Sequence, residues 1–128
     1  MRCEGTAVQE KPILELVTAS RNPLLLEGLR SLSALGGFRI VGEADEAREI
    51  LRLVVEHQPR VLLAEDEMVV HAANLVPDCR RSCPGLKVVL LEGPVDFVYT
   101  LPPSVHPDAL IRRTSSMAAL ARAIESLC

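Results

Sequence analysis

The sequence predicts an α/β fold in which a doubly wound, five-stranded parallel sheet is covered by helices on both faces. Short apolar runs typical of strands alternate along the chain with amphipathic segments typical of helices, and short polar loops connect them. One of these runs, residues 61–64, is apolar at every position, as a central parallel strand with two buried faces requires. The 128 residues, 48% of them hydrophobic, fit one domain with its own core.

The first strand and helix are expected directly after a polar, flexible leader, residues 1–12, so that the domain itself spans the remaining residues to the end. Residues 13–19 are mostly apolar and predict the strand. Asn22 and Pro23 open the helix, because an Asn side chain can cap a helix and Pro suits its first position. Apolar residues then recur at helical spacing until Gly36-Gly37 ends the helix.

The second strand is expected over residues 38–44. Asp45 is the predicted cap of a second helix, in which apolar and charged residues alternate at helical spacing. Gln58-Pro59 ends this helix. The third strand follows directly, over residues 61–64.

The third helix and the segment after the fourth strand are both interrupted by proline. Pro77 implies a helix that is either kinked or starts late, and Cys83-Pro84-Gly85 ends it. Residues 86–91 predict the fourth strand. Four prolines then fall within residues 93–108, where a regular helix would lose backbone hydrogen bonds at each one. We therefore expect an irregular loop there that replaces or shortens a fourth helix.

A short fifth strand and a last helix complete the predicted domain. The strand is expected over residues 109–112, and either Ser115 or Ser116 caps the helix. Apolar residues share one face of this helix: Met117, Leu120, Ile124 and Leu127.

Composition excludes several classes of protein. A net charge of −3 is too acidic for a chain that coats a phosphate backbone by itself. The sequence contains no apolar run of membrane-spanning length, and its start does not resemble a signal peptide, so a cytoplasmic location and no membrane partner are expected.

Metal and catalytic motifs are also missing from the sequence. Cys79 and Cys83 lie four residues apart with no His close by, which matches no zinc pattern, and both fall on the apolar face of the third helix. We expect them to be reduced, buried thiols, with a redox role as the alternative. No catalytic triad and no Gly-rich phosphate loop is present, so we do not expect an enzyme.

The order of these elements resembles a response-regulator receiver domain of the NarL/FixJ-like subfamily, whose members usually carry a LuxR-type helix-turn-helix domain. The resemblance runs from about Ile13 to Leu127, and four motifs carry it: Asn22-Pro23-Leu24-x-x-Glu27-Gly28-Leu29, Ile40-Val41-Gly42-Glu43-Ala44, Pro59-x-Val61-Leu62-Leu63 and Cys83-Pro84-Gly85-x-x-Val88-Val89. It implies the receiver (flavodoxin-like) architecture, with a site at the carboxyl ends of the strands.

A working receiver uses an acidic pair and an Asp to hold Mg²⁺ and accept a phosphoryl group, and a hydroxyl and a Lys to hold that group. The resemblance implies that these roles fall on residues of other types. Ser20 and Arg21 stand at the acidic pair, Glu65 at the acceptor, Glu92 at the hydroxyl, and Arg113 at the Lys, or Arg112 if the register slips by one.

These substitutions argue against phosphorylation and against Mg²⁺ binding. Arg21 is a permanent cation where the metal would sit, and Glu92 adds negative charge where a phosphoryl group would arrive. We expect a standing charge network in which Arg21 replaces the metal, Glu65 partly imitates a phosphorylated Asp, and Arg113 imitates the Lys contact. The alternatives are a decayed site with solvated charges, or a one-residue register error that makes Asp66 the acceptor.

The function implied is a phosphorylation-independent signalling and dimerisation module of a transcription regulator. DNA would be bound only through a further C-terminal helix-turn-helix domain. Possible homodimer contacts are Leu26 on the first helix and Ala118, Ala119 and Arg122 on the last. The alternatives are a stand-alone adaptor for a protein partner or a small ligand, the latter docking beside residues 93–108, and a receiver still phosphorylated on Asp66 or Glu65.

Overall fold

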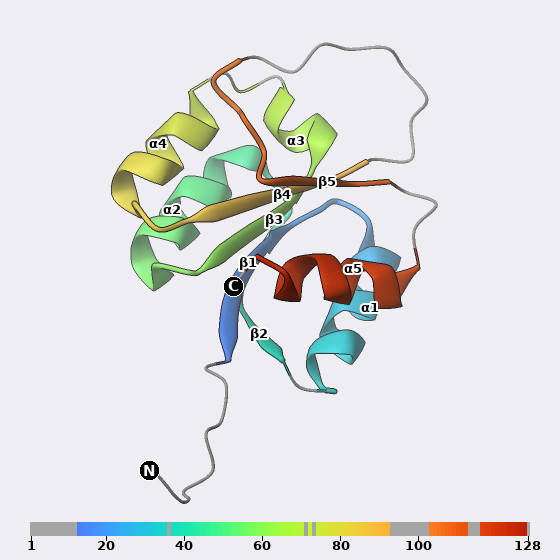
Figure 1. Ribbon diagram of the computed structural model, residues 1–128. Coiled ribbons are helices and arrows are strands. Elements are labelled where there is room, and N and C mark those ends of the chain that lie inside the picture. Colours follow the sequence, from blue (N-terminus) through green and yellow to red (C-terminus); the bar gives the residue numbers. More distant parts are fainter. Residues whose placement is uncertain are drawn as a thin grey trace, which may run out of the picture.

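The computed structural model describes residues 13–35, 37–70, 72, 74–92, 103–112 and 116–127, which form a five-stranded parallel sheet between two layers of helices (Figure 1). The strands lie in the order β2-β1-β3-β4-β5, so the chain winds in both directions from β1. The elements are β1 (Leu14–Ala19), α1 (Pro23–Ser33), β2 (Phe38–Ala44), α2 (Ala47–His57), β3 (Val61–Glu65), α3 (Asp66–Val70), α4 (Leu75–Ser82), β4 (Lys87–Leu91), β5 (Ala109–Ile111) and α5 (Met117–Glu125).

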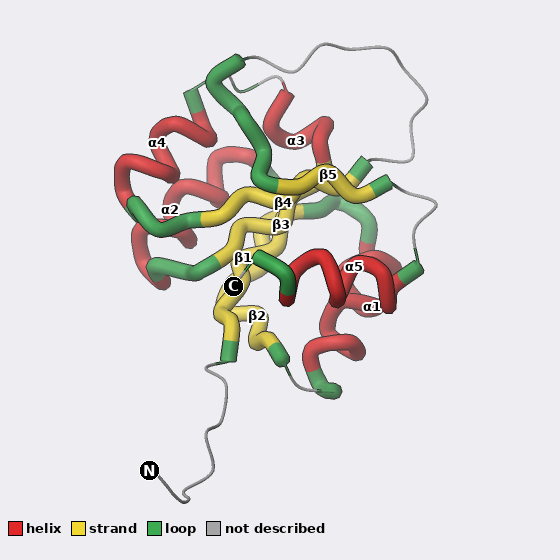
Figure 2. Tube along the Cα trace, in the orientation of Figure 1, coloured by secondary structure: helices red, strands yellow, loops and turns green. Residues whose placement is uncertain are grey.

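Two separate apolar layers cover the sheet. Helices α1 and α5 lie on one face, and α2, α3 and α4 lie on the other (Figure 2). Side chains of each central strand alternate between the layers: in β3, Leu62 and Ala64 face α2, α3 and α4, while Val61 and Leu63 face α1 and α5. Both faces of the sheet are therefore buried, as the apolar run in β3 predicts.

The expected helix starts are confirmed for α1 and α5. Asn22 Oδ1 accepts hydrogen bonds from the backbone N–H groups of Leu24 and Leu25, at 3.0 and 3.4 Å. Ser116 caps α5, because its Oγ accepts a hydrogen bond from the backbone N–H of Ala119 at 3.1 Å. None of the helices in the described part of the chain is long and apolar enough to cross a membrane.

Two details of the helices differ from the sequence prediction. Asp45 is not the cap of α2, because the helix begins at Ala47 and Glu46 is its N-cap residue. The short helix α3, which follows β3 without a loop, was not expected. Of the two possibilities for Pro77, the late start is correct: α4 begins at Leu75, so Pro77 lies in the first turn, where a missing N–H costs no intrahelical hydrogen bond.

The connection from β4 to β5 is irregular where it is described, over residues 103–108, as the prolines predict. Val105 is fully buried among the side chains of the α2, α3 and α4 layer. The Arg80 guanidinium on α4 donates hydrogen bonds to the backbone carbonyls of Val105 and His106, at 2.6 and 2.5 Å. Val105 thus covers part of the sheet, and Arg80 holds it there. Residues 93–102 and the leader, residues 1–12, lie outside the described residues.

The Arg80→Met substitution should lower the free energy of unfolding by about 2 kcal/mol, because the half-buried hydrogen bond to the Val105 carbonyl and the exposed one to the His106 carbonyl lose a charged donor. Arg81→Met is the matched control, since Arg81 is exposed and pairs only with Asp78 among the described residues. Urea denaturation of the two variants checks this. Equal stability of the two variants would show that Arg80 does not hold the 103–108 segment.

Candidate functional site

The carboxyl ends of β1 and β3 bring Ser20 and Glu65 together. The two strands are parallel neighbours with Ala19 opposite Ala64, so the next residue of each strand lies at the same edge of the sheet. Glu65 has the same parity as Val61 and Leu63 and therefore faces the α1 and α5 layer. Both side chains are buried, with 1% of Ser20 and 3% of Glu65 exposed.

Hydrogen bonds join these two side chains to each other and to the backbone. Ser20 Oγ donates to Glu65 Oε1 at 2.5 Å, and the backbone N–H of Arg21 donates to the same oxygen at 3.3 Å. Ser20 Oγ in turn accepts a hydrogen bond from the backbone N–H of Asn22 at 2.9 Å. A buried carboxylate needs such donors, because an unpaired buried charge is strongly unfavourable. The chain of hydrogen bonds from Asn22 through Ser20 to Glu65 supplies them.

The Arg21 side chain does not lie beside the Glu65 carboxylate, where we expected it. Its Nε donates to the backbone carbonyl of Asp45 at 3.2 Å, and the side chain is exposed. The cause is strand pairing, since Ala19 lies opposite Ala44 and the residues after these two meet at the edge of the sheet. The Arg21 contact to Glu65 is therefore made by the backbone, so the guanidinium does not take the place of a metal beside the carboxylate. Arg113, the other expected partner of Glu65, lies outside the described residues.

Glu92 and Arg112 lie at the ends of β4 and β5. Glu92 Oε2 is 3.9 Å from Arg112 Nη1, and the backbone N–H of Glu92 donates to the Ile111 carbonyl at 2.8 Å. Among the described residues, Arg112, the position that a one-residue slip selects, thus places a cation beside Glu92. Asp66 is the first residue of α3 and is buried, with 2% exposed.

These residues do not fit a Mg²⁺ site. Mg²⁺ requires several oxygen ligands in near-octahedral geometry. Of the three positions where a receiver places metal-binding carboxylates, only Glu65 offers one, and its Oε1 already accepts two hydrogen bonds. The Ser20 hydroxyl donates to that carboxylate, and the Arg21 side chain carries a positive charge.

A cavity of about 350 Å³ opens beside Glu65, and we call it the Glu65 pocket. It lies between the ends of β3, β4 and β5 and the first turns of α1 and α5. Its described lining residues are Asn22, Leu25, Glu65, Leu91, Glu92, Ile111, Arg112, Ser116, Met117 and Leu120. Sequence reasoning missed the apolar members, because each also reads as an ordinary core position. A larger hollow of about 1160 Å³ lies at the opposite, amino-terminal edge of the sheet.

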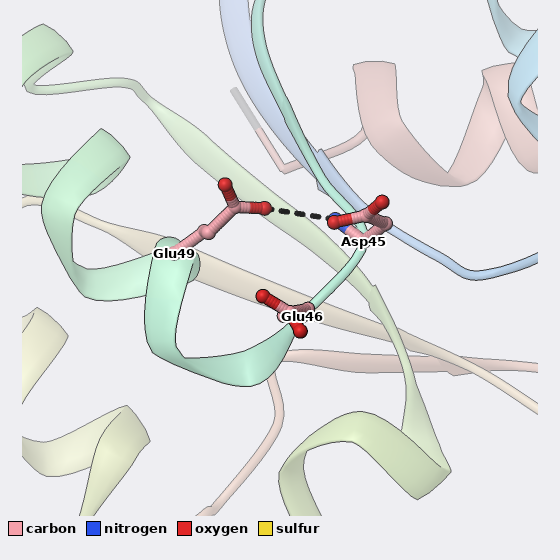
Figure 3. A group of neighbouring side chains, drawn as sticks. All are labelled: Asp45, Glu46 and Glu49. Atoms are coloured by element: carbon pink, nitrogen blue, oxygen red, sulfur yellow. Dashed lines mark hydrogen bonds between the residues drawn. The ribbon is translucent and has the colours of Figure 1, made fainter.

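One group of carboxylates outside this site has the spacing of a cation site. Asp45, Glu46 and Glu49 lie together at the start of α2 (Figure 3). Glu49 Oε1 accepts a hydrogen bond from the Asp45 backbone N–H at 3.4 Å, and Arg48 pairs with Glu46 at 2.9 Å. The Glu46 and Glu49 carboxylates thus already have partners within the chain.

The two described cysteines are buried free thiols, as expected. Burial, and to a smaller extent the nearby Cys83, raises the pKa of Cys79 to about 11. Burial also raises the pKa of Cys83. Since the thiolate is the reactive form, both side chains are poor nucleophiles at neutral pH. This favours the structural interpretation over the redox alternative.

The four expected dimer residues differ in their exposure. Ala118 and Arg122 are exposed on α5, whereas Ala119 and Leu26 are partly buried. Gly28 of α1 faces Met117 of α5. Leu26, two residues earlier, lies on the other flank of the helix. The most exposed large apolar residues of the α1 segment are instead Leu24 and Leu35, with 79% and 83% exposed.

No protein-family model matches the sequence, and no curated protein matches it. Solved structures do match the fold. The receiver domain of the response regulator NarL from Mycobacterium tuberculosis superposes with a TM-score of 0.71 and 22% identity, covering 91% of this chain and 96% of that one. A LuxR-family DNA-binding response regulator from Staphylococcus aureus superposes with a TM-score of 0.74 and 19% identity, covering 90% of this chain and 98% of that one.

The RcsB response regulator from Salmonella typhimurium gives a TM-score of 0.71 at 17% identity, covering 91% of this chain and 62% of that one. At these identities the likeness establishes the fold. It confirms the receiver architecture that the order and motifs of the sequence predict.

The Ser20→Ala substitution should lower the free energy of unfolding by about 2 kcal/mol, because it removes a donor from the buried Glu65 carboxylate. Ser31→Ala, on the exposed surface of α1, is the matched control and should change stability by less than about 0.5 kcal/mol. Chemical denaturation of both variants measures the difference. An unchanged stability of the Ser20 variant would show that this hydrogen bond does not hold the site together.

Proposed function

We propose that this chain is a non-enzymatic, phosphorylation-independent receiver module of a transcription regulator. The observation that carries the proposal is the hydrogen bond from Ser20 to Glu65. In a phosphorylated receiver, the acceptor carboxylate must face a metal ion and an incoming phosphoryl donor. Here the side chain at that position is buried and accepts hydrogen bonds from groups of its own chain.

The charges around Glu65 also oppose phosphoryl transfer. A phosphoryl donor carries negative charge, and the Glu65 and Glu92 carboxylates both line the pocket it would enter. No metal neutralises this repulsion in the proposed state, because the donor set does not fit Mg²⁺. Signalling by the module therefore depends on a partner, a ligand or its own assembly.

The alternative acceptor, Asp66, is disfavoured by its place in the fold. It is buried as the first residue of α3, and the edge of the sheet presents Glu65 instead. Unlike Glu65, it is not among the described residues that line the Glu65 pocket, so it does not face the space that a donor would enter.

We propose the wider role on the basis of solved structures that share this fold. The matched structures from Staphylococcus aureus and Salmonella typhimurium are described as a DNA-binding response regulator and as a response regulator studied for DNA interaction. We propose that a DNA-binding domain outside these residues supplies the contact to DNA. A chain of net charge −3 has no electrostatic attraction of its own to a phosphate backbone.

Incubation with acetyl phosphate and Mg²⁺, followed by intact mass measurement, should leave the mass of the chain unchanged. The physical reasons are the two hydrogen bonds already made to Glu65 Oε1 and a donor set that does not fit Mg²⁺. A receiver domain with an intact acidic pair, treated in parallel, shows that the reagent is active. A stable adduct of one phosphoryl group, mapped to Glu65 or Asp66, would overturn the proposal.

We also propose a homodimer, with the outer face of α5 at the interface. Ala118 and Arg122 are exposed there, and Ala118 offers a close approach for a second helix. Sedimentation velocity should show a concentration-dependent dimer, and Ala118→Glu should weaken it about tenfold by placing a charge in the contact. Val55→Glu is the control, because Val55 is an exposed residue of α2 in the other layer, and this substitution should leave dimerisation unchanged. A monomer at all concentrations would remove assembly as the signalling mechanism.

A further inference from the structure

We propose that the Glu65 pocket binds a small, singly charged organic cation, a primary amine with an apolar tail. This deepens the proposed function and rests on it in one respect, that the pocket is not used for phosphoryl chemistry. The volume of about 350 Å³ falls at the lower end of the range of small-molecule sites, roughly 300–1,000 Å³. The pocket thus suits a ligand smaller than a nucleotide.

The walls of the pocket define the apolar part of the ligand. Leu25, Leu91, Ile111, Met117 and Leu120 line it, from four different elements. Aliphatic walls with a few polar groups at one end are the usual construction of a small-molecule site. Met117 also adapts to rings and chains alike, since its thioether side chain is flexible and polarisable.

The polar end of the pocket defines the charged part. Glu65 is 97% buried, and the hydrogen bonds recorded from described residues go to Oε1, whereas none goes to Oε2. Among the described lining residues, two carboxylates, Glu65 and Glu92, stand against one guanidinium, that of Arg112. Arg112 is 76% exposed and pairs with Glu92 at 3.9 Å, so its charge lies at the rim. A single positive charge on the ligand would pair with Oε2 of Glu65.

Two helices begin at this pocket, and a helix N-terminus ordinarily favours an anion. Here the side chains of the two caps already occupy N–H groups of the first turns. Asn22 Oδ1 accepts from Leu24 and Leu25, and Ser116 Oγ accepts from Ala119. The Glu65 carboxylate itself accepts the backbone N–H of Arg21, just before α1. The caps thus occupy part of the N–H groups that would attract an anion, and the Glu65 carboxylate disfavours a second anion beside it, which favours a cation as the external ligand.

A ligand in the pocket would contact both helices of one layer. Leu25 belongs to α1 and Met117 to α5, and Met117 Cε lies 3.3 Å from the position that a Cβ on Gly28 would occupy. The packing between α1 and α5 is thus part of the pocket wall. Binding can bias this packing, which gives the module an input that does not require phosphate.

The test is a titration of the 128-residue chain with 2-phenylethylamine as the probe. Binding is followed through the backbone amide signals in NMR spectra. We expect saturable shifts at Leu25, Leu91, Ile111 and Met117, and binding about tenfold tighter than that of 2-phenylethanol, which has the same ring but no charge. The carboxylate 3-phenylpropanoate should not saturate these shifts. Glu65→Gln should weaken the amine about tenfold, and Glu27→Gln, which removes the same charge from the exposed surface of α1, should not.

Because Glu65 is buried and its variant can fail to fold, Glu92→Gln at the half-exposed rim serves as a second variant with the same expected direction. Equal binding of the amine and the alcohol, tighter binding of the carboxylate, or shifts confined to other residues would each overturn the proposal. These outcomes differ from a failure of the proposed function, which is a phosphoryl adduct in the mass measurement. A chain that takes no phosphate and binds no amine would retain the proposed function and lose this inference.

Discussion

The requirement that the central strands bury both of their faces is the constraint on which the rest of this structure depends. Side chains of a strand alternate with a period of two, so burying Leu62 and Ala64 under α2, α3 and α4 leaves Val61 and Leu63 for α1 and α5. The same alternation carries Glu65 to the α1 and α5 side at the end of β3. A shift of one residue would exchange the two layers and would bring Asp66 to the edge in its place.

A carboxylate that the strand forces into a buried position must find donors, and the donors it finds decide what the site can do. In this chain they are a hydroxyl and a backbone N–H, both from the segment just after β1. Neither is a metal ion or a mobile cation. The result is a closed local structure at the edge where receivers react with phosphate, and the free space beside it is lined mainly by apolar side chains.

The connection between β4 and β5 shows a second way of meeting the same constraint. The sheet has to be covered on the side of α2, α3 and α4, and prolines disfavour a regular helix in the segment available. In the described part, Val105 is buried in that layer, and Arg80 satisfies the carbonyls of the irregular backbone. A side chain on α4 thus provides hydrogen bonds that a helix would provide internally.

The sequence by itself determined the fold class, the strand order implied by the receiver pattern, the Asn22 cap, a serine cap at either Ser115 or Ser116, and the presence of Ser20 and Glu65 at one edge. The fold class and the caps follow from local rules, namely periodicity and capping, whereas the strand order and the placement of Ser20 and Glu65 follow from the resemblance to receivers. It did not determine the start of α2, the helix α3 or the contacts of Arg21 and Arg112. Only the tertiary structure decided these. For the two arginines the reason is that a long side chain can reach several partners. The pairing of Ala19 with Ala44 brings the Asp45 carbonyl to Arg21, and no spacing in the sequence encodes that distance.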